Sequence, residues 1–200
     1  MKKLLSLLLL LSFTIKAQEI KIGTQTWTTK NLEVTKYRNG DAIPQVQDKN
    51  AWAKLKTGAW CYYENKRAKG TTYGKLYNWF AVNDTRGLAP KGYHIPTDAE
   101  WTTLTDNLGG LSIAGTKMKS TSGWDNNGNG TNTSGFAGLP GGYRNSNGDF
   151  YSIGANGGWW SSLGSGANGA WYYNLNYNNG NVPSYSYNKQ NGFSVRCIKD

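Results

Sequence analysis

The residue types that carry most enzyme chemistry are scarce in this chain. His94 is the only histidine among 200 residues, and Cys61 and Cys197 are the only two cysteines. A metal site with two histidine ligands is therefore excluded, and a Ser-His-Asp triad would depend on His94 alone. The sequence also has no Gly-x-Ser-x-Gly turn to present a nucleophilic serine. We expect His94 to be a structural hydrogen-bonding residue and the protein not to be an enzyme.

Two glycine patterns imitate nucleotide-binding motifs. Gly164, Gly166 and Gly169 have the spacing of a dinucleotide fingerprint, but no helix signal follows them. Residues 70–75 resemble a phosphate-binding loop that is one residue short, with Leu76 where a metal-binding hydroxyl belongs. Both are coincidences of a glycine-rich chain, and we expect no organic cofactor.

One sequence pattern could indicate a metal-binding loop. Asp125, Asn127 and Asn129, followed by Gly130, match the first half of a calcium-binding loop. Phe136 stands where such a loop has its bidentate acid, so a single carboxylate would face the ion. We favour an Asx-rich turn over a calcium site, and we expect any carbohydrate binding to be calcium-independent.

Residues 167–188 have the composition of a recognition surface. Tyrosine offers contact area at low entropic cost, while Asn and Ser adapt their hydrogen bonds, and the stretch carries no charge. The candidate ligand-binding residues are Tyr172, Tyr173, Asn174, Asn176, Tyr177, Asn178, Tyr185 and Tyr187. The alternative has comparable weight: hairpins with Asn-Gly turns need the same residues for turns and cross-strand pairs.

The beginning of the chain predicts export. Lys2 and Lys3 precede an apolar run over residues 4–15, and Ala17 supplies a small residue before a cut at Gln18. The run is shorter than the roughly 20 residues that cross a bilayer. We expect a signal peptide over residues 1–17 and one domain over residues 18–200, secreted or at the cell surface and not membrane-spanning.

The charge is positive but scattered. The formal net charge is +10, and without residues 1–17 there remain 19 basic and 12 acidic residues, or +7. An exported protein seldom meets nucleic acid, so we expect no nucleic-acid partner. Solvated surface lysines explain the surplus better than attraction to acidic polymers.

The two cysteines are far apart in sequence. In an oxidising compartment an even pair is most simply a disulfide, so we expect Cys61 to be joined to Cys197. Two buried free thiols are the alternative.

The front half carries signals of regular structure. Residues 25–34 and 59–63 have the pattern of strands. Apolar residues at helical spacing predict a helix over residues 73–82. A second helix is predicted from Thr97 and Glu100, which form a Ser/Thr-x-x-Glu capping box, to Leu108, before Gly109 and Gly110.

The amino-acid composition changes beyond Ser120. Residues 121–192 are rich in Gly, Asn, Ser, Tyr and Trp, with Asn-Gly turn pairs between short aromatic stretches, and residues 193–198 suit a final strand. Disordered segments are poor in aromatic residues and rich in charge, which this stretch is not. Helices in front and short antiparallel strands with long ordered loops behind predict an α+β domain.

A resemblance covers nearly the whole chain after residue 17. Five stretches resemble, in order, the Fibrobacter succinogenes major paralogous domain: QTWTTKNL at 25–32, YGKLYNW at 73–79, PKGYHIPTDAEW at 90–101, GFAGLPGGYR at 135–144 and GFSVRC at 192–197. The family is similar to formylglycine-generating, sulfatase-modifying enzymes. The resemblance implies a C-type-lectin-like fold whose two termini lie close together.

The resemblance also bears on activity. Formylglycine-generating enzymes use a pair of copper-binding cysteines ahead of the final strand, and residues 139–191 contain no cysteine. Cys197 matches the place of a structural disulfide cysteine in those enzymes. C-type-lectin-like domains of this kind serve in some bacteria as targets of retroelements that diversify Asn, Tyr and Ser codons near the C-terminus.

These observations favour a recognition module that binds a glycan or a surface protein through residues 167–188. A structural component of the cell surface without a specific ligand is the second hypothesis. A divergent enzyme outside the cytoplasm is the third.

Overall fold

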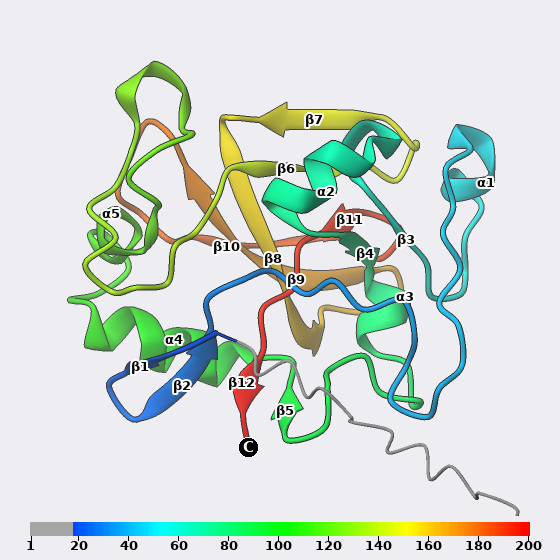
Figure 1. The fold of residues 1–200 in the computed structure, drawn as a ribbon, viewed down its shortest axis with the longest axis horizontal. Coiled ribbons are helices and arrows are strands. Elements are labelled where there is room, and N and C mark those ends of the chain that lie inside the picture. The colour runs from blue at the N-terminus through cyan, green and yellow to red at the C-terminus, as the bar shows by residue number, and fades with distance from the viewer. Residues whose placement is uncertain (1–17) are drawn as a thin grey trace, which may run out of the picture.

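The computed structural model describes residues 18–200, which form a mixed fold of mostly sheet with few helices (Figure 1). The predicted signal peptide lies outside these residues. The helices are α1 (Lys49–Ala53), α2 (Arg67–Tyr73), α3 (Trp79–Val82), α4 (Asp98–Asn107) and α5 (Ala114–Met118), with 3₁₀ turns η1 (Tyr63–Asn65) and η2 (Asp125–Asn127). The strands are β1 (Glu19–Ile22), β2 (Gln25–Thr28), β3 (Trp60–Cys61), β4 (Leu76–Asn78), β5 (Tyr93–His94), β6 (Gly141–Arg144), β7 (Phe150–Ile153), β8 (Asn156–Gly164), β9 (Gly169–Asn176), β10 (Ser184–Asn188), β11 (Gly192–Phe193) and β12 (Ile198–Lys199).

A four-stranded sheet joins the two ends of the described chain. Its order is β1-β2-β12-β5, and Ile198 of β12 lies opposite both Trp27 of β2 and His94 of β5. Figure 1 shows the red β12 beside the blue β2. The expected closeness of the two ends is therefore confirmed for residues 18–200.

A larger sheet of eight strands contains most strands of the back half of the chain, together with β3 and β4 from the front half. Its order is β10-β9-β8-β6-β11-β4-β3, and β7 pairs with β6. The long antiparallel pair β8 and β9 is its centre, and the pairing of β6 with β8 is parallel. The predicted α+β composition, with short strands and ordered loops behind, agrees with this mixed structure.

The helix predicted over residues 73–82 is wrong. Gly74 has a φ of +76°, which ends α2 at Tyr73, and residues 76–78 form β4 between β3 and β11. All three residues of β4 are buried, because the strand has neighbours on both edges and both faces. Asn78 then starts α3 by accepting a hydrogen bond from the Ala81 N–H at 3.1 Å. The apolar spacing arose from a fully buried strand followed by one helical turn.

The second predicted helix is confirmed as α4. Thr97 accepts from the Glu100 N–H and Glu100 accepts from the Thr97 N–H, so the capping box is complete. Trp101 and Leu104 lie on its buried face. The predicted strands are shorter than expected: β2 ends at Thr28, and residues 194–197 form no strand between β11 and β12.

The core is built mainly from aromatic rings. One cluster gathers Trp27, Trp101, Phe136 and Tyr173 between α4 and the sheets. Trp101 and Tyr173 stack with ring centroids 4.7 Å apart and an interplanar angle of 14°. The Trp101 centroid also lies 4.9 Å from that of Trp27. A second cluster contains Trp160, Tyr172 and Phe193 on the other side of β8 and β9.

Buried cations tie the long loops together. Lys75, Lys119, Arg144 and Arg196 are each at most 5% exposed, and within residues 18–200 none of them forms an ion pair with a carboxylate. They donate to backbone carbonyls instead, and each lies over an aromatic ring. The side chains thereby satisfy backbone carbonyls, most of which lie in loops.

The predicted disulfide is wrong in this structure, where both cysteines are free and buried. Cys61 lies in β3 with Trp52 and Leu76, whereas Cys197 belongs to the cluster around Trp160. The fold buries the two thiols in different hydrophobic clusters, and burial raises the pKa of each to about 12.

We therefore expect no thiol labelling of the native protein at pH 8 and labelling of two thiols after denaturation without a reductant, because only an exposed thiolate reacts. Mass spectrometry of the labelled protein measures this directly. If the denatured chain takes up label only after reduction, Cys61 and Cys197 form a disulfide, and the prediction of two free thiols is wrong.

None of the helices among residues 18–200 is long and apolar enough to cross a membrane.

Candidate functional site

Three of the predicted ligand-binding residues lie inside the protein. Tyr172, Tyr173 and Asn174 belong to β9 and are at most 9% exposed. β9 pairs with β8 along one edge and β10 along the other, and its two faces pack into separate hydrophobic clusters that contain Tyr172 and Tyr173. Tyr172 stacks on Phe193 at 4.1 Å and Tyr173 stacks on Trp101. The expectation that Tyr172 and Asn174 face solvent is wrong, because their strand is central and not peripheral.

Three further predicted residues lie at the end of β9: Asn176 is its last residue, and Tyr177 and Asn178 begin the loop that follows. The Lys119 ammonium donates hydrogen bonds to the carbonyls of Asn176 and Tyr177, at 3.0 and 3.4 Å. The Asn176 amide donates to Asn156, and its oxygen accepts from the Asn178 N–H. Tyr177 is half-buried and Asn178 is exposed. The loop is fixed by its own hydrogen bonds, which leaves few free polar groups.

The remaining two predicted residues are on the surface. Tyr185 and Tyr187 project from β10 and are 48% and 39% exposed. The Tyr187 ring lies 6.4 Å from that of Tyr143 in β6, which in turn lies 5.8 Å from Tyr151 in β7. Tyr185 joins these rings through Tyr172, whose centroid is 6.0 Å from that of Tyr185 and 5.1 Å from that of Tyr187. The set of Tyr143, Tyr151, Tyr185 and Tyr187 is called the tyrosine patch below.

The sequence reasoning missed Tyr143 and Tyr151. They are directly opposite each other in the hairpin of β6 and β7, whose turn contains Asn147 and Gly148. That Asn-Gly pair was the available signal, because residues at equal distances on either side of such a turn become cross-strand neighbours.

A rigid aromatic base supports the tyrosine patch. Phe193 contacts Tyr143, Tyr172 and Tyr187, with ring centroids 5.4, 4.1 and 6.0 Å away. The rings of Phe193 and Tyr172 meet above Gly158 of β8, where an added Cβ would lie 2.7 Å from Phe193. Glycine at this position lets rings from β9 and β11 stack across β8. The patch is therefore held by packing, and its outer rings need little ordering on binding.

The tyrosine patch is neutral. Burial and the neighbouring tyrosines raise the pKa of Tyr143, so its hydroxyl keeps its proton at neutral pH. Within the described chain, the hydroxyls of Tyr151 and Tyr185 make no hydrogen bond. Apolar ring faces with free hydroxyls suit an uncharged polar ligand.

The proposed calcium residues form a turn in which some ligand atoms are already used. Asn126 and Asn127 have left-handed φ values of 49° and 59°. The side-chain oxygen of Asn129 accepts the Trp124 N–H at 3.1 Å. Among residues 18–200, no group of three or more His, Cys, Asp or Glu side chains is placed to hold a metal ion. One of the proposed ligand oxygens, that of Asn129, is therefore already used within the fold.

His94 lies between two carboxylates near the end of the chain. Its Nε2 is 2.7 Å from Glu100 and its Nδ1 is 2.8 Å from Asp200. Burial, the largest influence, lowers the pKa of His94, but the hydrogen bonds to Asp200 and Glu100 together outweigh it and raise the pKa. This geometry agrees with the structural role expected for His94.

The ionised His94 is expected to stabilise the fold below its raised pKa, and this contribution should fade as pH rises through that value. Urea unfolding between pH 5.5 and 8.5 should show a stability that falls with pH more steeply than in His94→Gln. Equal slopes in the two proteins would contradict the prediction.

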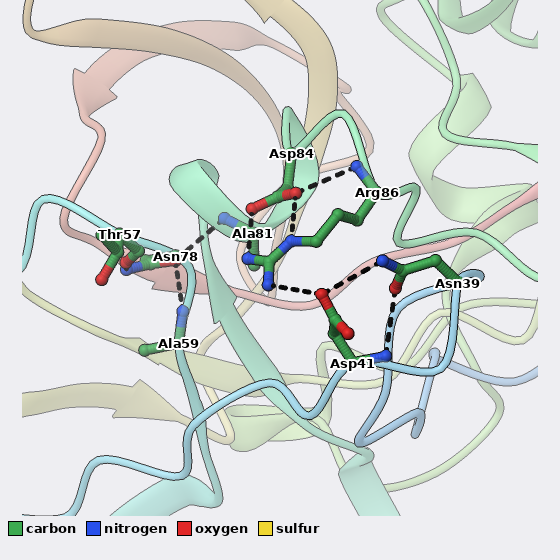
Figure 2. Close-up of polar contacts among 8 residues, drawn as sticks. All are labelled: Asn39, Asp41, Thr57, Ala59, Asn78, Ala81, Asp84 and Arg86. Atoms are coloured by element: carbon green, nitrogen blue, oxygen red, sulfur yellow. Dashed lines mark hydrogen bonds and ion pairs between the residues drawn. The ribbon is translucent and has the colours of Figure 1, made fainter.

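One shallow cleft of about 280 Å³ lies beside α3, lined in part by Trp79, Phe80 and Asp84. Figure 2 shows the Arg86 guanidinium between the carboxylates of Asp84 and Asp41. Arg86 donates to Asp84 at 2.8 Å and to Asp41 at 3.2 Å, and its side-chain hydrogen bonds lower the pKa of Asp84 to about 2. Lys56 also lines this cleft, so two cations balance the two carboxylates.

A second cleft of about 320 Å³ is bordered by Asn31, Lys30 and Arg196. Behind it, the Asn31 amide oxygen accepts from Trp159 at 2.8 Å and from Arg196 at 2.7 Å. Asn31 and Arg196 therefore connect β2, β8 and the end of the chain, and their polar atoms serve the fold.

The fold and surface define a sheet-rich domain that gathers exposed tyrosines over a packed aromatic base. The chain belongs to the Fibrobacter succinogenes major domain family, which matches it over residues 20–199. A comparison with curated proteins gives no match.

Proposed function

We propose that the protein is a recognition module, exported by the predicted signal peptide, that binds a glycan or a surface protein through the tyrosine patch. We also propose that its fold is C-type-lectin-like. The observation that carries the proposal is the gathering of Tyr143, Tyr151, Tyr185 and Tyr187 over the fixed rings of Tyr172 and Phe193.

Three properties of the patch support this function. Contiguous aromatic surface on a soluble domain commonly marks an interaction site. Tyrosine contributes large contact area with few rotatable bonds, so ordering it costs little free energy. Flat ring faces beside hydroxyl groups complement sugar rings or the polar surface of another protein.

The cysteines support a role other than cysteine-dependent oxidation. Such chemistry needs accessible thiolates, and burial raises the pKa of Cys61 and Cys197 to about 12. No catalytic step is proposed for any residue of the chain.

The test is a binding screen of the protein against glycans and surface proteins, with and without calcium. For a ligand that binds, Tyr151→Ala and Tyr187→Ala should each weaken binding by about tenfold or more, as for central aromatic contacts. Leu111→Ala and Leu163→Ala are matched controls, because these exposed side chains lie outside the patch.

Unchanged affinity in both tyrosine variants would refute the patch as the binding surface. If no glycan or surface protein binds, the structural role at the cell surface becomes the better hypothesis.

A further inference from the structure

The strand path of the eight-stranded sheet ends at β3 on one side and at β10 on the other, and these two ends differ in how they are covered. At β3 the chain covers its own edge: the Val46 N–H donates to the Trp60 carbonyl and the Trp60 N–H donates to Pro44, both at 3.0 Å. At the other end of the sheet is β10, and all five of its residues are exposed. Strand edges with unpaired backbone groups are templates for pairing with another strand.

The hydrogen-bond pattern shows which groups of β10 face outward. The Asn174 N–H donates to Pro183 at 3.0 Å, and the Lys189 N–H donates to Asn168 at 2.9 Å. In an antiparallel pair only alternate residues exchange hydrogen bonds with the neighbouring strand. Pro183, Tyr185, Tyr187 and Lys189 therefore turn their backbone groups toward β9. Those of Ser184 and Ser186 and the Asn188 N–H point away from the sheet, whereas the Asn188 carbonyl already accepts the Asn191 N–H at 2.9 Å.

The five residues of β10 lack the features that usually protect an edge strand, although Pro183 and Lys189 flank them on either side. Proteins place lysine, proline or a bulge in such strands to prevent pairing. The sequence of β10 is SYSYN, without charge or proline, and its register with β9 has no bulge. β9 is also uncharged, so two positively charged copies of the chain can approach here without like charges meeting.

We propose that β10 pairs antiparallel with β10 of a second copy of this chain, around a two-fold axis at Ser186. This register exchanges hydrogen bonds between the two Ser186 residues, and the Asn188 N–H of the second copy donates to the Ser184 carbonyl. Tyr185 then lies opposite Tyr187 of the second copy at a closely spaced position, which makes two tyrosine pairs. The alternating sequence complements itself, which is why a second copy fits better than an unrelated strand.

The dimer has a consequence for the surface. A two-fold axis of this kind is perpendicular to the sheet, so the tyrosine patches of both copies lie on the same face and join across the axis. The inference goes beyond the proposed function and does not depend on it, since pairing needs only the strand edge. A dimer without ligand binding, or ligand binding by a monomer, would separate the two proposals.

The pairing should be weak. Two five-residue strands bury less area than the roughly 1,200 Å² of a stable protein interface. We expect a reversible dimer whose population rises with protein concentration between about 1 μM and 1 mM. Sedimentation velocity across this range measures it, and a monomer throughout would overturn the proposal.

Two substitutions of Ser186 test the register. Ser186→Lys places two ammonium groups opposite each other on the axis, and it should weaken dimerisation by about tenfold or more. Thr24→Lys is the control, because Thr24 is an exposed turn residue of the other sheet. Equal unfolding midpoints will show that each variant is folded. Dimerisation as strong in Ser186→Lys as in Thr24→Lys would overturn the proposal.

Ser186→Cys gives a positive result that misfolding cannot imitate. Opposed residues that exchange hydrogen bonds have Cα atoms about 5.5 Å apart, within the range that a disulfide bridges. Mild oxidation should therefore link two copies through residue 186, and reduction should release them. Cross-linking no faster than that of Thr24→Cys would contradict the two-fold register.

Discussion

Replacing Arg196 by methionine is expected to lower the free energy of unfolding by about 4 kcal/mol, since the change leaves several buried acceptors unpaired. Arg196 is 1% exposed. It donates to the carbonyls of Thr28 and Phe136 at 2.8 and 2.7 Å, and to Asn31 at 2.7 Å. Methionine fills much of the same volume but donates no hydrogen bond.

The charge of Arg196 contributes less to stability than the geometry of its hydrogen bonds. Burial lowers the pKa of its guanidinium to about 9, which shows that the fold holds this cation at an electrostatic cost. The planar guanidinium reaches β2, Asn31 and residues 136–137 at once, so its loss removes several hydrogen bonds between the front of the chain and its end.

Chemical denaturation of Arg196→Met measures the effect. Lys36→Met is the control, because Lys36 is exposed and its replacement should change stability by no more than about 0.5 kcal/mol. Arg196→Lys should recover part of the loss, since one ammonium replaces some of the donors. A stability of Arg196→Met equal to that of Lys36→Met would show that the carbonyl network contributes nothing.

The parts of the fold that the sequence predicted are those with local causes. The capping box of Thr97 and Glu100 acts within one helical turn, so α4 was found from residue types alone. The pairing of β4 with β3 and β11 depends on residues far away in the chain. Leu76 and Tyr77 have a spacing that fits a helix equally well, and tertiary pairing decided the outcome.

The disulfide prediction failed for a similar reason. Compartment and an even number of cysteines favoured a bond between Cys61 and Cys197. Whether two thiols meet depends on the packing around each one, and here that packing belongs to separate clusters. Nothing local to either cysteine carries this information.

The candidate surface was predicted by composition but not by position. Residues 167–188 supply both core and surface tyrosines, because β9 lies inside the sheet and β10 lies at its edge. Composition cannot distinguish these two strands. The other half of the tyrosine patch comes from the hairpin of β6 and β7, which only the folded structure brings beside β10.

Tyr173 and Tyr185 are expected to respond oppositely to the same substitution, although they lie in the same tyrosine-rich segment. Tyr173→Ala should lower the free energy of unfolding by about 3 to 5 kcal/mol, because the ring is buried and stacks on Trp101 at 4.7 Å. Tyr185→Ala should lower it by about 1 kcal/mol or less, since the ring is 48% exposed and touches Tyr172 on one side. Urea unfolding of the two variants measures the difference, with Tyr173→Phe as a control that keeps the stacked ring.

The effects on ligand affinity should be the opposite of the effects on stability. Tyr185→Ala should lose ligand binding, whereas Tyr173→Phe should keep near-normal affinity. Equal destabilisation by both alanine variants would mean that β10 belongs to the core, and the tyrosine patch would then lose its role as a surface.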